Sequence, residues 1–107
     1  MENLNLMNNE EIIFQERLRL VREGIIEKVL VEHLTPSGEK IEFHEPEEIH
    51  TLKKWEKLGY KKKKGESPIT TLKIWKPYHN KNGKGLCFKP ADFYILKQME
   101  ENNEQVN

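Results

Sequence analysis

Nine lysines between residues 53 and 76 are the side chains of this sequence with the clearest chemical meaning. Ammonium groups neutralise phosphates and release counterions from nucleic acids, and aromatic rings can stack on bases. The lysines are Lys53, Lys54, Lys57, Lys61, Lys62, Lys63, Lys64, Lys73 and Lys76, and the residues among or just after them that could stack on bases are Tyr60, Trp75, Tyr78 and His79. The pattern indicates a surface that binds a polyanion.

Ten of these residues form the predicted nucleic-acid surface: Lys53, Lys57, Lys61, Lys62, Lys63, Lys64, Lys73, Trp75, Lys76 and Tyr78. Residues 51–90 contain no arginine, and arginine forks supply most contacts to guanine edges. We therefore expect binding that is independent of base sequence. Two other interpretations of the lysines stay open: a surface that is only solvated or neutralised internally, and a docking surface for a protein. Trp75 shares a strand face with Lys73, so both a core and a half-exposed position stay open for it.

The charges are segregated along the chain, although the protein has no net charge. Residues 1–50 hold 5 Lys or Arg against 12 Asp or Glu, whereas residues 51–90 hold 12 Lys against 2 Glu. Such segregation steers a charged partner only if folding keeps the two groups apart in space. Five acidic residues form a second candidate surface, for a protein partner: Glu32, Glu42, Glu45, Glu47 and Glu48.

Other motifs indicate no catalysis, metal or cofactor. The stretch HEPEEIH at residues 44–50 lacks the HExxH spacing of a zinc site, and Pro46 interrupts the helix that such a site needs. The stretch NKNGKG at residues 80–85 lacks the arrangement of a phosphate-binding P-loop. Cys87 lies between two apolar residues without a Cys-His-acid set, which is typical of a buried, inert thiol.

The length of 107 residues indicates one domain, residues 1–107, with flexible tails at residues 1–8 and 101–107. The single cysteine excludes an internal disulfide. No apolar run approaches the ~18 residues of a membrane span, and the first residues lack the order of a signal peptide. We therefore expect a protein of the cytoplasm that contacts no membrane.

The first half of the chain predicts two helices and a hairpin. Apolar residues at helical spacing predict a helix over residues 9–23, with either Asn8 or Asn9 as its N-cap. Alternation over residues 28–35 and 40–45, around the turn sequence TPSGE, predicts a β-hairpin. A second helix is expected over residues 46–58, with Pro46 in its first turn.

The second half predicts shorter strands. Alternation over residues 69–78 predicts a strand that Pro77 ends, paired with a strand over residues 60–64. An exposed loop over residues 79–85 and a short strand over residues 86–89 follow, and Pro90 opens a last short helix or turn. The expected fold is α+β: a small twisted antiparallel sheet of three to five strands with N-terminal, central and short C-terminal helices.

Residues 49–100 resemble the N-terminal domain of ArdC-type antirestriction proteins and small proteins of phages and conjugative elements. The motifs that carry the resemblance are Trp55, Leu58-Gly59, Lys64-Gly65-Glu66, Trp75-Lys76, and Phe93-Tyr94 with Gln98. The resemblance implies single-stranded DNA binding and a gene on a mobile element. It does not extend to a metalloprotease-like domain.

Two functions from different classes follow. The first is a non-enzymatic module that binds single-stranded DNA through its lysines, in the cytoplasm of a host cell. The alternative is a phage-encoded inhibitor of a host defence nuclease, an anti-CRISPR or antirestriction protein, whose acidic hairpin occupies a basic nucleic-acid channel or whose lysines contact the effector. A hydrolase or nuclease has the least support.

Overall fold

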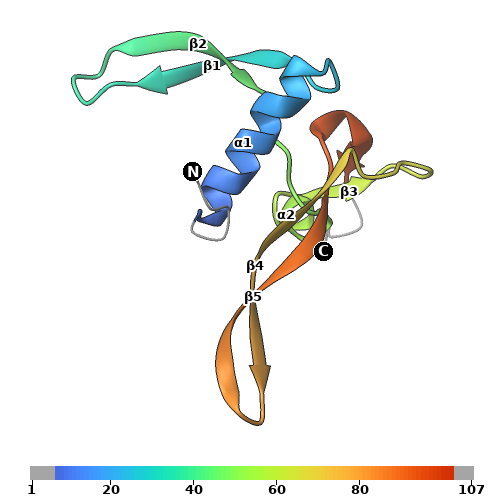
Figure 1. Cartoon of the computed structure of the whole chain (residues 1–107). Coiled ribbons are helices and arrows are strands. Elements are labelled where there is room, and N and C mark those ends of the chain that lie inside the picture. The colour runs from blue at the N-terminus through green and yellow to red at the C-terminus, as the bar shows by residue number, and fades with distance from the viewer. Residues whose placement is uncertain (1–6, 103–107) are drawn as a thin grey trace.

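The computed structural model describes residues 7–102, and its class is α+β, as the sequence predicted. The elements in chain order are α1 (Asn9–Arg22), β1 (Lys28–Leu34), β2 (Lys40–Pro46), α2 (Leu52–Lys57), β3 (Tyr60–Lys62), β4 (Thr70–Asn80), β5 (Gly83–Phe93), the 3-10 helix η2 (Leu96–Gln98) and β6 (Met99–Glu101). Every strand pair is antiparallel, and the strands form three two-stranded ribbons, β1–β2, β3–β6 and β4–β5 (Figure 1). A single sheet of three to five strands was expected. With only 36% hydrophobic residues, the chain has few apolar side chains with which to cover a wider sheet.

Helix α1 begins where the sequence placed its cap. The Asn8 side chain accepts the Glu11 N–H at 2.8 Å, and the Glu11 carboxylate accepts the Asn8 N–H at 3.3 Å. This reciprocal pair satisfies two of the amides that a helix start leaves unpaired. Gly24, with φ of 74°, follows the end of the helix in the left-handed region that favours glycine.

The β1–β2 hairpin is confirmed, and it projects from the rest of the molecule (Figure 1). Its register pairs Lys28 with Pro46 and Leu34 with Lys40. In the turn, the Gly38 N–H donates to the Thr35 carbonyl at 2.9 Å. Nearly all of its residues are exposed, so neither face of this ribbon is covered along its length.

The second helix is shorter than expected, because Pro46 ends β2 instead of opening a helix. The Arg17 guanidinium donates to the carbonyls of Pro46 and Glu47, and the His50 backbone pairs with Tyr94. These bonds hold residues 47–51 in an extended path. The helix then begins at Leu52, with the Thr51 hydroxyl accepting the Lys54 N–H at 3.3 Å.

Strands β4 and β5 form one long ribbon, and three expectations about this region were wrong. Pro77 and Pro90 lie inside the strands, and the loop between the strands is residues 81–82 alone. A two-stranded ribbon has an outer edge on each strand, and proline is tolerated where its missing N–H would face outward. The ribbon can therefore continue through both prolines.

Strand β3 pairs with β6, not with β4 as the sequence suggested. The pairing places Lys61 opposite Glu100, so opposite charges face each other across the ribbon. Glu101, which was expected in a flexible tail, pairs with Tyr60, and Asn8 caps α1. The remaining residues of the two expected tails lie largely outside the described range.

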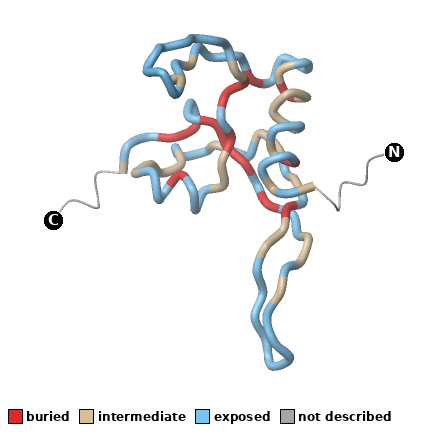
Figure 2. The backbone as a smooth tube through the Cα atoms, turned by 90° about the vertical axis from the view of Figure 1, so that its left-hand side faces the viewer, coloured by how far each residue is buried: buried red, intermediate tan, exposed pale blue. Residues whose placement is uncertain are grey.

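Two small hydrophobic clusters hold the elements together: the larger joins α1, β4 and β5, and the smaller consists of Trp55, Tyr94 and Met99 with Tyr60 packed against them. Leu20 from α1, Phe93 from β5 and Ile49 from the connection to α2 are 0%, 1% and 2% exposed. Figure 2 shows the buried residues gathered where the elements meet, while both long hairpins are pale blue over most of their length. The radius of gyration is 16.6 Å, against about 13 Å for a compact chain of this length. The fold therefore has a small buried region from which the β1–β2 and β4–β5 hairpins project.

Within residues 7–102, no helix has both the length and the apolar character that crossing a membrane requires.

Replacing Leu20 by Ala tests the shared core. Because Leu20 is fully buried, we expect a loss of about 3 kcal/mol in the free energy of unfolding, measured by urea denaturation. Leu34→Ala makes the same chemical change at a residue that is 70% exposed, and should cost less than about 0.5 kcal/mol. Equal losses in the two variants would contradict the assignment of the core.

Candidate nucleic-acid interface

The first group of predicted binding residues lies along α2, β3 and the turn that follows. We call this stretch, residues 53–64, the α2–β3 segment. Lys53 and Lys57 are exposed on α2, on whose other side Trp55 is buried. Gly59, with φ of 94°, turns the chain from the helix into β3. Lys63 and Lys64 are exposed after the strand, so the segment presents lysines at both of its ends.

The lysines of the α2–β3 segment differ in their partners. Lys62 Nζ donates to the Glu66 carbonyl at 3.0 Å, so it stabilises the turn. Lys61 lies opposite Glu100. Lys53, Lys57, Lys63, Lys64 and Lys73 form no ion pair with any carboxylate of residues 7–102.

Ion pairs are instead found in the acidic part of the chain. Arg19 pairs with Glu16 and Glu23 on α1, and His33 Nε2 lies 3.1 Å from the Glu45 carboxylate. The Arg19 guanidinium lowers the pKa of Glu16. Carboxylates of the first half are therefore neutralised partly by cations of that half, which leaves the exposed lysines of the α2–β3 segment without internal counterions.

The second group of predicted binding residues lies on β4. Lys73 is exposed, whereas Lys76 Nζ donates to the Pro90 carbonyl at 3.2 Å. Trp75 is half-buried: its ring packs 4.8 Å from Phe88, and its Nε1 donates to the Met7 carbonyl at 3.1 Å. The Asn9 side-chain amide also donates to the Trp75 carbonyl at 2.9 Å, and its oxygen accepts the Trp75 N–H at 2.8 Å. Trp75 therefore fixes the start of α1 to β4.

Of the two aromatic residues in the α2–β3 segment, Trp55 is buried and Tyr60 is half-buried against it. Trp55 is 5% exposed, and its Nε1 donates to the Tyr94 carbonyl at 3.0 Å. The Tyr60 and His50 rings meet Trp55 edge-on, at 5.6 and 4.9 Å between centroids. Burial lowers the pKa of His50, and the Glu48 carboxylate opposes this shift. Exposed aromatic surface among the lysines is thus provided by β4, where Tyr78 is 42% exposed.

Tyr78 lies over a glycine on the neighbouring strand. It is the register partner of Gly85, and a Cβ added at Gly85 would lie 3.1 Å from the Tyr78 ring. The absence of a side chain at residue 85 therefore lets the ring lie against the ribbon.

The acidic residues of the alternative surface separate into two kinds. Glu32 and Glu42 are exposed and directly opposite each other in the β1–β2 hairpin. Glu45 pairs with His33, and Glu48 is exposed beside His50. Glu47 is different, because it is 8% exposed and its carboxylate accepts the Glu27 N–H at 2.8 Å. Glu47 therefore holds the base of the hairpin and offers little surface to a partner.

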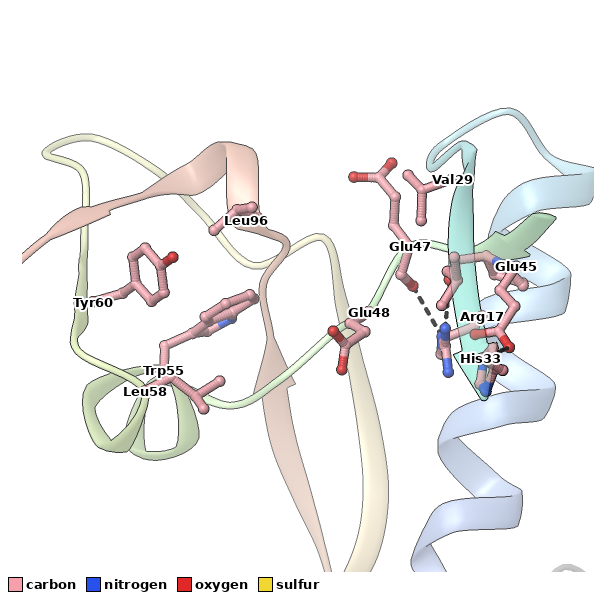
Figure 3. A pocket seen from close by; sticks show the side chains of 12 residues that line it. Arg17, Val29, His33, Glu45, Glu47, Glu48, Trp55, Leu58, Tyr60 and Leu96 are labelled. Atoms are coloured by element: carbon pink, nitrogen blue, oxygen red, sulfur yellow. Dashed lines mark hydrogen bonds and ion pairs between the residues drawn. The ribbon is translucent and has the colours of Figure 1, made fainter. Parts of the chain in front are cut away.

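A groove of about 670 Å³ separates the β1–β2 hairpin from α2, β3 and η2. Figure 3 shows the side chains of Trp55, Tyr60 and Leu96 on one side of it and those of Val29 and Glu45 on the other. Within residues 7–102, no three His, Cys, Asp or Glu side chains are placed to hold a metal ion.

Comparison of the chain with family models, curated proteins and solved structures gave no match.

Two of the motif residues named in the sequence analysis, Trp55 and Gln98, hold the fold together. The Gln98 amide donates to the Ser67 carbonyl at 2.6 Å and to the Glu66 carboxylate at 3.1 Å, while its oxygen accepts the Ile95 N–H. The Lys63 N–H also donates to the Gln98 carbonyl at 2.8 Å. Together with the bond from Trp55 to Tyr94, these contacts tie the α2–β3 segment and the turn after it to residues 94–98. Of the lysines that lie between these motif residues, Lys57, Lys63 and Lys73 are exposed, and Lys61 and Lys62 are half-buried.

Sequence reasoning considered the lysine-bearing loop at residues 79–85 as a contact for nucleic acid, but it did not place Lys81, Lys84 and Lys89 on one projecting ribbon. Lys81 and Lys84 were assigned to a loop, and Lys89 to a short strand. The signal was present in Asn82-Gly83, a dipeptide that favours a tight hairpin turn between alternating strands. Asn80 supports this turn by accepting the Asn82 N–H at 2.8 Å.

Replacing Glu47 by Ala tests its structural role. The loss of a hydrogen bond between a buried carboxylate and a backbone amide should cost about 2 kcal/mol, measured as a lower urea midpoint. Glu48→Ala is the matched control, since the Glu48 side chain is 74% exposed, and should cost less than about 1 kcal/mol. A Glu47→Ala variant as stable as the control would return Glu47 to the candidate binding surface.

Proposed function

We propose that this protein is a non-enzymatic module of a phage or another mobile element that binds single-stranded DNA without reading its sequence. The observation that carries the proposal is the set of exposed lysines on α2, after β3 and on β4 that lack a carboxylate partner in residues 7–102. Such cations attract phosphates and gain free energy from the counterions that binding releases.

The proposed interface uses the exposed lysines first. Lys53, Lys57, Lys63, Lys64 and Lys73 contact phosphates, and Lys61, Lys62 and Lys76 border them. Tyr78 is the member of the predicted set with an exposed ring, and base stacking on such a ring tolerates any sequence. Trp75 supports the surface from behind by fixing α1 to β4.

Two features support DNA as the partner over the other interpretations of the lysines. Internal neutralisation would require carboxylates at the lysines, and the ion pairs described above involve other cations. A protein docking surface is typically depleted in lysine. The preference for a single strand and the setting on a mobile element come from the resemblance to ArdC-type proteins.

Replacing Lys53, Lys57, Lys63 and Lys64 by Gln should weaken binding of a fluorescein-labelled single strand at least roughly tenfold at ~50 mM salt. The measurement is fluorescence anisotropy over a salt series. Wild-type affinity should fall steeply with salt, and the variant should show a shallower slope, by about 0.7 for each lost phosphate contact. The control is Lys28→Gln with Lys40→Gln on the acidic hairpin, which should bind like the wild type.

Failure of the wild type to bind at ~50 mM salt would overturn the proposal. An equal loss in the Lys28/Lys40 control would show that general charge, and not this surface, determines affinity.

One observation favours the alternative of a defence-nuclease inhibitor. Glu32 and Glu42 are directly opposite in the β1–β2 ribbon, and like charges in such a pair are destabilising. A basic channel on a partner would relieve this repulsion. Under this alternative the acidic hairpin, with Glu45 and Glu48 near its base, takes the place of nucleic acid.

The alternative predicts a stoichiometric complex with a purified restriction or CRISPR effector, seen by size-exclusion chromatography. Glu32→Lys with Glu42→Lys should abolish the complex by charge repulsion, and the four-lysine variant above should leave it intact. Nuclease activity that is unchanged by an excess of wild-type protein, for representatives of both effector types, would count against this function.

A further inference from the structure

The β4–β5 ribbon projects beyond the core as an arm. Its base is anchored by Ile74, Ala91 and Phe93, all of which are buried. Residues 77–84, which include the turn, are all exposed. Figure 1 shows the tip pointing away from the rest of the molecule, at the opposite end from the β1–β2 hairpin.

The charge of the arm has one sign. Residues 73–90 contain no Asp or Glu, and the first acidic residue at the base is Asp92, which accepts a hydrogen bond from Thr71. The cationic side chains of the arm are Lys73, Lys76, Lys81, Lys84 and Lys89. A polyanion therefore complements this arm over its whole exposed length.

Both faces of the arm carry cations and apolar surface. On one face, the pair of Pro77 and Leu86 adjoins the pair of His79 and Lys84. The other face carries Tyr78 over Gly85 and includes Lys76 and Lys89. Side chains alternate between faces along a strand, so a ligand that uses all of these groups must enclose the ribbon from two sides.

The major groove of duplex DNA has this property. It is about 12 Å wide and 8.5 Å deep, and it admits a two-stranded ribbon between two walls of phosphates. The exposed part of β4, residues 77–80, spans about 10 Å at the rise of a β-strand, so the exposed arm is longer than the groove is deep. A single strand, by contrast, covers one face of a ribbon.

We propose that the β4–β5 arm inserts into the major groove of B-form DNA when the bound single strand continues into a duplex. On such a DNA, Lys73, Lys76 and Tyr78 contact the duplex with the rest of the arm, and the α2–β3 segment holds the single strand. This inference rests on the proposed function and extends it: the favoured substrate is a single strand that continues into a duplex. The arm contains no arginine, and Asn80 is engaged in the turn. Contact is therefore with groove walls and phosphates, and it is independent of sequence.

The test compares four labelled nucleic acids at ~50 mM salt: a single strand, a DNA duplex of about two helical turns, the same duplex with a single-stranded overhang, and the RNA duplex of the same sequence. The RNA duplex is the matched ligand, because it has the same charge per strand but a deep, narrow major groove that side chains cannot read. We expect the overhang substrate to bind at least roughly tenfold more tightly than either simple DNA, since two linked contacts reinforce each other. The DNA duplex should bind at least roughly fivefold more tightly than the RNA duplex.

The matched variants are Lys81→Gln with Lys84→Gln at the tip, and Lys28→Gln with Lys40→Gln on the other hairpin. All four residues are exposed, so an unchanged melting temperature is expected for both variants. The tip variant should lose roughly tenfold in affinity for the DNA duplex and its salt slope should fall by about two. Its affinity for the single strand should change less than roughly twofold, and the control should bind all ligands like the wild type.

Equal binding of the DNA and RNA duplexes, or equal losses for duplex and single strand in the tip variant, would overturn insertion of the arm. Wild-type binding of the single strand but not of the duplex would also overturn it, and would leave the proposed function intact. Binding of the duplex alone would overturn the single-strand proposal and support the arm. Binding of none of the four ligands would overturn both.

Discussion

The small amount of buried apolar surface limits how much of each ribbon this molecule can cover. A two-stranded ribbon is marginally stable by itself in water, and this chain has three of them. They depend on two small clusters: one buries Leu20, Ile49 and Phe93, and the other buries Trp55 and Met99 beside β3 and β6. The Arg17 guanidinium also binds two consecutive carbonyls at residues 46–47, at the base of the β1–β2 hairpin. Because so few apolar residues are available, the ends of the long ribbons extend into solvent, and polar and charged side chains predominate there.

This constraint also separates the charges. The acidic hairpin leaves the core at one end and the basic arm at the other (Figure 1), while the α2–β3 segment is fixed by Trp55 and Gln98. Carboxylates such as Glu16 and Glu23 pair with Arg19 on their own helix. The exposed lysines of the α2–β3 segment and of the arm form no ion pair with carboxylates of residues 7–102 and can therefore pair with the phosphates of a partner. This is the basis of the proposed role in DNA binding.

Local signals in the sequence predicted much of the fold. The Asn8 cap, the TPSGE turn and the spacing of apolar residues gave α1 and the first hairpin, because these features act over a few residues. Pairing over longer distances was predicted poorly: β3 joins β6, and prolines 77 and 90 lie inside strands. Whether a strand can continue through these prolines depends on which of its edges is left unpaired. That is decided by how the strands assemble in the folded protein, not by the neighbouring residues in the sequence. The lysines could be named from the sequence, but the burial of Glu47 and the extension of the arm could not.

Chemical footprinting of lysines tests the central claim most directly. Amine acetylation read by mass spectrometry, with and without DNA that carries a single-stranded overhang, reports each ammonium group separately. The account predicts protection of Lys53, Lys57, Lys63 and Lys64, and of Lys81 and Lys84 at the tip, while Lys28 and Lys40 on the acidic hairpin stay reactive. Uniform protection of all lysines, or protection centred on Lys28 and Lys40, would contradict it.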